Sequence, residues 1–113
     1  MHEFSIAMNI VDIASAYAMK ENASVIKEIE IEVGELAGVV IDSLEFSLEA
    51  AVKETILEGA SRKITTVPGK ARCRSCEHIF NIQDMFMACP LCGSAAPELI
   101  QGRELRVKSL LVE

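Results

Sequence analysis

Four cysteines are the residues of this sequence whose type and spacing most clearly specify a chemistry. They form two Cys-x-x-Cys pairs separated by twelve residues, Cys73 with Cys76 and Cys89 with Cys92. A two-residue gap lets backbone amides turn toward the first sulfur while both thiolates face one ion, and Gly93 can adopt the positive φ of such a turn. Two such turns predict a closed tetrahedral site. Zinc is the expected ion, because thiolate-rich tetrahedral sites select zinc or iron and nothing in the sequence indicates electron transfer.

A closed site of four cysteines leaves no open position for a substrate, so the predicted zinc is structural. The alternative is two redox-active Cys-x-x-Cys pairs, but these need an adjoining βαβ unit that the sequence does not indicate. Structural disulfides are not expected either, because we expect the chain in the reducing cytosol. His78 follows Cys76 by two residues. Beside a saturated site we expect it on the surface rather than as a ligand.

The start of the chain, Met1-His2-Glu3, holds a second candidate metal site. The amine of Met1, the backbone nitrogen of His2 and the His2 imidazole can wrap an ion in adjoining chelate rings. Glu3 could supply a fourth donor through its amide nitrogen or its carboxylate, and such nitrogen and oxygen donors suit Ni(II) or Cu(II). The alternative is that Glu3 complements the positive end of a helix while His2 frays in water. These three residues alone favour that alternative.

Length, composition and charge limit the classes of protein. At 113 residues the chain can form one ordinary domain, or a small core with a stapled satellite. A net charge of −6 opposes binding to phosphate backbones or anionic lipid, so we expect protein and small-ligand partners and neither nucleic acid nor a membrane. The apolar N-terminal stretch has no basic leader and is interrupted by Asn9 and Asp12. It resembles neither a secretory signal nor a membrane span, and we expect a cytoplasmic protein.

Hydrophobic periodicity predicts the helices. Apolar residues at three- and four-residue steps predict a largely buried helix over residues 4–20. A second helix is predicted to begin at an Asp-x-x-Glu capping box, formed by Asp42 and Glu45. Gly59 is predicted to end it.

Alternation and β-branched residues predict the strands. Residues 27–33 alternate strictly, with three glutamates on one face, and residues 103–111 alternate with basic residues on the outward face. We therefore expect opposite charges to pair across these two strands. Residues 62–67 form a β-branched run that Pro68 ends. The predicted fold is α+β, with two helices packed on a small mixed three-stranded sheet and a zinc ribbon of four cysteines inserted before the last strand.

Two function classes find little support in the residues. No nucleophile with a base, phosphate loop or pair of catalytic carboxylates stands out, so an enzyme is not expected. Zinc ribbons often bind nucleic acid, but residues 69–97 carry three basic against two acidic residues, and Phe80 and Phe86 are their only aromatics. That is little for a phosphate track or a stacking platform. If the N-terminal residues bind no nickel, the alternative function is a zinc-ribbon adaptor or a nucleic-acid-binding module.

Several stretches carry a resemblance that runs the length of the chain. They are MHEFS at 1–5, VGELAGV at 33–39, the two cysteine pairs and GRELRVKSL at 102–110. With them the sequence resembles the HypA family of hydrogenase nickel-incorporation proteins. The resemblance implies a metallochaperone that carries Ni(II) as cargo on the Met1 amine and on His2, with Glu3 assisting. It also implies structural Zn(II), bound by Cys73, Cys76, Cys89 and Cys92.

The resemblance further implies domains and partners. Residues 1–68 with 99–113 would form a nickel-binding α/β domain, and residues 69–98 a zinc-binding domain. Nickel would pass, with a partner GTPase, to the large-subunit precursor of [NiFe]-hydrogenase, and in some bacteria to urease. A monomer and a homodimer both remain open.

One stretch departs from the family pattern. Members often have acidic residues just after the Gly-Val of the loop, whereas this chain has Val40 and Ile41 before Asp42. The resemblance therefore does not secure an extra carboxylate ligand from that loop.

Overall fold

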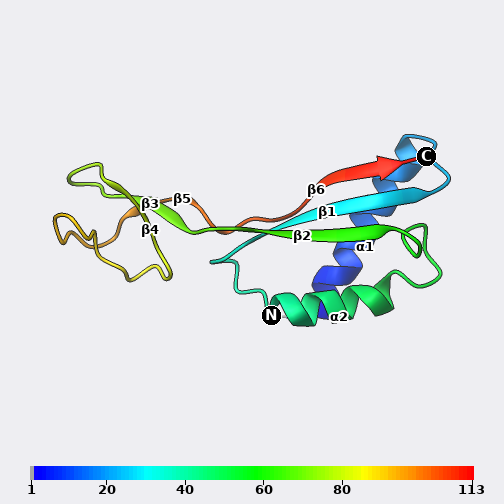
Figure 1. The fold of residues 1–113 in the computed structure, drawn as a ribbon, viewed down its shortest axis with the longest axis horizontal. Coiled ribbons are helices and arrows are strands. Elements are labelled where there is room, and N and C mark those ends of the chain that lie inside the picture. Colours follow the sequence, from blue (N-terminus) through cyan, green and yellow to red (C-terminus); the bar gives the residue numbers. More distant parts are fainter. Residues whose placement is uncertain (1) are drawn as a thin grey trace. The chain divides into compact units, whose positions relative to one another are not determined.

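The computed structural model describes residues 2–113, so Met1, the predicted source of the amine ligand, lies outside the described residues. Within this range two helices and six strands follow one another (Figure 1). Their bounds are α1 (Glu3–Lys20), β1 (Ile26–Gly34), α2 (Ile41–Ala51), β2 (Ser61–Val67), β3 (Lys70–Arg72), β4 (Ile79–Asn81), β5 (Glu98–Gln101) and β6 (Leu105–Val112).

The first helix, α1, buries one apolar stripe. Its buried residues recur at three- and four-residue steps and are Ile6, Ala7, Ile10, Val11, Ala14 and Ala18. Glu3 in the first turn and Lys20 in the last complement the helix dipole. The helix predicted over residues 4–20 is confirmed. No helix among residues 2–113 has the length and hydropathy to cross a membrane.

The central strand of the larger sheet is β1, in the order β2-β1-β6. Val25 and Glu113, at the ends of β1 and β6, exchange both backbone hydrogen bonds, at 3.0 and 3.3 Å. This exchange is the pattern of an antiparallel pair, so β6 runs against β1. β2 follows the α2 crossover and runs in the direction of β1 (Figure 1). The predicted α+β fold with a mixed three-stranded sheet is confirmed.

The core beside this sheet is built from aliphatic side chains. β1 contributes Ile29, Ile31 and Val33, and α2 contributes Leu44 and Leu48, all at most 3% exposed. Burial of one such side chain stabilises the fold by about 1.5–3 kcal/mol. α1 packs against α2 over this core. The two helix starts are thereby held in one compact body.

The second helix differs from its prediction at both ends. The N-cap of α2 is Val40, which provides no side-chain cap, and Asp42 lies inside the first turn, so the predicted capping box is wrong. The regular helix ends at Ala51, and turns continue to Gly59. Glu54 in these turns has a φ of 62°, which a helix cannot accommodate. The predicted helix end at Gly59 is therefore also wrong.

Charged side chains pair across β1 and β6, as predicted. Arg106 Nε donates to Glu32 Oε1 at 2.7 Å. Lys108 Nζ lies 3.7 Å from Glu30 and 3.8 Å from Glu32. Arg103, the first basic residue of the alternating segment 103–111, makes no ion pair among the described residues. The face of the sheet that carries these ion pairs is the one that faces solvent.

The described residues form two compact units. One comprises the chain up to Glu32 with Val39–Thr65 and Arg106–Glu113, and the other comprises Val33–Gly38 with Thr66–Leu105. The second unit contains all four cysteines and an antiparallel sheet in the order β4-β3-β5. The functional division into residues 1–68 with 99–113 for nickel and 69–98 for zinc stays a prediction.

Candidate metal centres

The turn after β3 presents the first cysteine pair. The backbone N–H groups of Ser75 and Cys76 both donate to Cys73 Sγ at 3.4 Å. The Cys73 N–H donates to the His78 carbonyl at 2.8 Å, and the Glu77 N–H donates to the Cys73 carbonyl at 2.9 Å. Glu77 has a φ of 64°, the left-handed conformation that closes the turn. The Cys73 sulfur is therefore surrounded by backbone donors that favour a thiolate.

The second cysteine pair repeats this geometry. The Leu91 N–H donates to Cys89 Sγ at 3.4 Å. The Cys89 N–H donates to the Ser94 carbonyl at 3.0 Å, and the Gly93 N–H donates to the Cys89 carbonyl at 2.9 Å. Gly93 has a φ of 79°, as its place after the second pair predicted. Both pairs thus use one local design.

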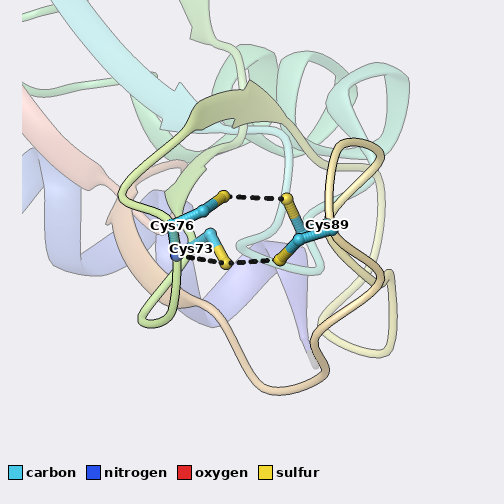
Figure 2. A group of neighbouring side chains, drawn as sticks. Cys73, Cys76 and Cys89 are labelled. Carbon is cyan, nitrogen blue, oxygen red and sulfur yellow. Dashed lines mark hydrogen bonds between the residues drawn. The ribbon is translucent and has the colours of Figure 1, made fainter.

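The two turns bring the four sulfurs to one point. Cys73 Sγ lies 3.4 Å from Cys92 Sγ, and Cys76 Sγ lies 3.8 Å from Cys89 Sγ. Figure 2 shows the labelled side chains pointing toward one another. All four sulfurs lie within 4.8 Å of each other. With Zn–S bonds of about 2.3 Å, the edge of a tetrahedron is about 3.8 Å, so the residues fit a tetrahedral thiolate-bound ion such as zinc.

Hydrogen bonds and neighbouring sulfurs set the protonation of the thiols. The Cys76 amide lowers the pKa of Cys73 to about 6. The Ser94 hydroxyl, and then the Ser94 amide, lower the pKa of Cys92. At Cys76 the backbone amide of His78 acts in the same direction, but burial and the other sulfurs outweigh it and raise the pKa to about 12. Four adjacent thiolates repel one another, and a divalent cation that displaces the protons removes that repulsion.

Ser94 also orders the exposed side of the site. Its hydroxyl lies 3.4 Å from Cys92 Sγ and donates to Ser75 Oγ at 2.9 Å. Cys76 and Cys92 are exposed, whereas the other two cysteines are buried. Ser94 was not among the site residues predicted from the sequence. The signal was a hydroxyl two residues after the last cysteine of the second pair.

His78 lies on the surface, as expected. Its ring stacks with Phe80, with ring centroids 6.0 Å apart and an angle of 15° between the planes. It is not among the four residues whose ligand atoms converge.

Leu36 packs onto the small core of this unit, which consists of Ala71, Cys73, Phe80, Ile82 and Cys89. Two glycines make room for it. A Cβ on Gly69 would lie 2.9 Å from Leu36 Cδ1, and a Cβ on Gly102 would lie 3.1 Å from the same atom. We call Leu36, Gly69 and Gly102 the leucine seat.

The N-terminal residues line an open depression of about 450 Å³. Its lining residues are His2, Glu3, Phe4, Asp42, Ser43, Phe46 and Ser47. The structure thus brings His2 and Glu3 together with Asp42, whose contribution the sequence did not secure. We call this depression the N-terminal pocket.

The donors of this pocket do not form a closed cage. Among residues 2–113 only the four cysteines form a group of three or more ligand atoms within 4.8 Å of one another. His2 is exposed and Glu3 is partly exposed. An ion bound here would keep coordination positions open to water and to other proteins, whereas an ion held by four sulfurs would have no open position.

Comparison with known proteins identifies a family whose members match this chain over nearly its full length. The model of a family described as "Hydrogenase/urease nickel incorporation, metallochaperone, hypA" matches residues 1–112. The chain belongs to this HypA family. The resemblance that the N-terminal motif, the loop and the cysteine pairs indicated is confirmed.

Named relatives agree with this HypA assignment. A hydrogenase maturation factor HypA of Parabacteroides distasonis is 42% identical over 113 residues, covering 100% of this chain and 98% of that protein. One of Geobacter metallireducens is 41% identical and covers 100% of both chains. The solution structure of the Ni metallochaperone HypA from Helicobacter pylori has a TM-score of 0.72 at 24% identity, covering 99% of this chain and 97% of that one. At this identity the structure supports the fold.

Proposed function

We propose that this protein is a nickel metallochaperone that binds Ni(II) at its N-terminus and delivers it during maturation of [NiFe]-hydrogenase, and of urease where cells make it. The observation that carries the proposal is the family match over residues 1–112, which includes the Met1-His2-Glu3 start. The protein would act as a carrier and not as an enzyme. Its cargo leaves unchanged.

The proposed nickel ligands are the Met1 amine and the imidazole and backbone nitrogen of His2, with Glu3 assisting. Nitrogen and oxygen donors in a tetragonal arrangement suit Ni(II). The open N-terminal pocket supports this set, because His2 and Glu3 both line it. Few, exposed ligands also suit an ion that must be released to another protein.

The proposed zinc ligands are Cys73, Cys76, Cys89 and Cys92. Their converging sulfurs and backbone donors support a retained structural Zn(II). The second unit has only a small core, so a bound ion would supply much of its stability. The chain would then hold one labile ion and one retained ion.

The proposed partners follow from nickel delivery in the cytoplasm. A GTPase of hydrogenase maturation would act with this protein, and the large-subunit precursor of [NiFe]-hydrogenase would receive the ion. We propose that both approach the N-terminal pocket, because a short transfer distance keeps nickel from competing ligands. A homodimer is compatible with this role.

A zinc-ribbon adaptor without nickel function is the alternative. It would keep the cysteine site and leave His2 without a role. Substitution of His2 therefore separates the two functions while the zinc site stays intact.

Hydrogenase maturation in cells that lack this gene tests the proposal. At low external nickel, the wild-type gene should restore hydrogenase activity and His2→Ala should not. His78→Ala is the matched control, because it also removes an exposed imidazole but lies outside the N-terminal pocket. Equal restoration by His2→Ala and the wild type would leave the adaptor as the better account.

A further inference from the structure

The carboxylate of Glu3 makes a contact that links the starts of the two helices. The backbone N–H of Val40 donates to Glu3 Oε2 at 3.3 Å, across 37 positions of sequence. Glu3 is the first residue of α1, and Val40 is the N-cap of α2. Both lie in the same compact unit.

We propose that the Glu3 side chain is a positioning residue of the nickel site, which ties the start of α2 to the start of α1 and leaves nickel binding to the backbone nitrogens and to His2. This inference rests on the proposed nickel function. It decides between the two donors that Glu3 offers, its amide nitrogen and its carboxylate.

The start of α2 depends on this contact because it has no cap of its own. Val40 has an apolar side chain and makes no side-chain cap hydrogen bond. The first N–H groups of a helix lack acceptors within the helix. Glu3 therefore accepts, from another element, the N-cap N–H that the Glu or Gln at N3 accepts in a capping box.

Asp42 lies close to the same contact along the chain. Asp42 lies two residues after Val40, in the first turn of α2, and lines the N-terminal pocket with His2. If Glu3 releases Val40, the end of α2 is free to fray, and Asp42 moves with it. The contact therefore maintains the distribution of negative charge around the pocket.

The backbone at Glu3 remains available to an ion. The first hydrogen bond of α1 runs from the Ile6 N–H to the His2 carbonyl, at 3.1 Å. The Glu3 N–H precedes this bond and has no acceptor in the helix. The two parts of Glu3 can thus act separately, the amide nitrogen on the ion and the carboxylate on Val40.

Two variants distinguish positioning from ligation. Glu3→Gln keeps an oxygen that can accept the Val40 hydrogen bond but loses the charge, whereas Glu3→Ala loses both. Loss of a group that orients metal ligands typically weakens binding by about 10- to 100-fold. We expect that loss in nickel affinity for Glu3→Ala and near-wild-type affinity for Glu3→Gln. Glu28→Gln, an exposed glutamate of β1, is the matched control.

Nuclear magnetic resonance of the full chain, without nickel, tests the contact itself. The chemical shift of the Val40 amide proton should follow the titration of the Glu3 carboxylate in the wild type and in Glu28→Gln. His2 and Asp42 also line the pocket, so the same titration in His2→Ala and Asp42→Asn identifies the responsible group. The Val40 shift should persist in both of these variants and disappear in Glu3→Ala and Glu3→Gln.

The two measurements fail separately. The positioning role is overturned if the chemical shift of the Val40 amide proton does not depend on Glu3. It is also overturned if Glu3→Gln reduces nickel affinity as much as Glu3→Ala does. Absence of nickel binding by the wild type overturns the proposed function, while the titration still decides whether Glu3 holds Val40.

Discussion

Glu77 and Gly93 occupy equivalent positions in the two cysteine turns. The N–H of each donates to the carbonyl of the first cysteine of its pair, at 2.9 Å in both turns. Their φ values are 64° and 79°. One turn therefore places a side chain where the other has glycine.

Substitutions at these two positions should change the stability of the cysteine unit in opposite directions. A left-handed conformation costs a non-glycine residue about 1–2 kcal/mol, so Gly93→Ala should destabilise the cysteine unit by about 1 kcal/mol. Nothing lies within 4 Å of the added Cβ, so the cost comes from the backbone. Glu77→Gly should stabilise the unit, because glycine adopts this conformation without that cost. Resistance of the bound metal to a chelator measures both, and a Gly93→Ala protein as resistant as the wild type would contradict the equivalence.

Loss of one cysteine should loosen its unit and spare the other. Cys73→Ser removes a buried cysteine of the proposed zinc site, and apparent binding energies of structural zinc reach about 10–16 kcal/mol. Residues 70–97 should lose their dispersed amide signals, while those of α1 and α2 remain. Metal analysis of the purified protein is the companion measurement, with His78→Ala as the control that keeps the ion. Wild-type protein without stoichiometric zinc or iron would contradict the structural role.

The leucine seat should tolerate no added methyl group. A Cβ on Gly69 would lie 2.5 Å from the Ile82 carbonyl oxygen and 2.9 Å from Leu36 Cδ1. Gly69→Ala should therefore destabilise the cysteine unit by about 1–3 kcal/mol, the usual cost of overpacking. Gly59→Ala is the control, because nothing lies within 4 Å of its added Cβ. Thermal unfolding compares the two, and equal midpoints would show that the seat has room.

The charged side chains on the larger sheet should stabilise the fold less at acidic pH. The Thr65 hydroxyl donates to Glu30 Oε2 at 2.9 Å. This bond first, and then Lys108, lower the pKa of Glu30. A carboxyl whose pKa is lower in the folded state stabilises the fold above its unfolded value, and this contribution is lost as the pH falls through the folded value. Thr65→Val should raise the pKa of Glu30, which a carbon-detected titration would measure. An unchanged pKa would assign the effect to the lysine.

The periodic elements could be predicted from the sequence, because each depends on local spacing. The apolar steps of α1, the alternating glutamates of β1 and the Cys-x-x-Cys pairs all carry their signal within a few residues. The bounds of α2 could not. Its N-cap meets Glu3, 37 positions away, and its end precedes Glu54 in a left-handed turn. Leu36 and Gly69 likewise become neighbours only in the folded chain.

Nickel calorimetry on three untagged proteins tests the central claim most directly. They are the wild type, a form extended by one residue before Met1, and His2→Ala. The extension blocks the amine yet keeps every side chain, so the chelate loses its anchoring ring, and His2→Ala removes the imidazole. Both groups bind nickel only in their deprotonated forms.

We expect tight nickel binding by the wild type alone. An extended protein that binds nickel as tightly as the wild type would show that the amine is no ligand. If His2→Ala also binds nickel as tightly as the wild type, the proposed nickel site is contradicted.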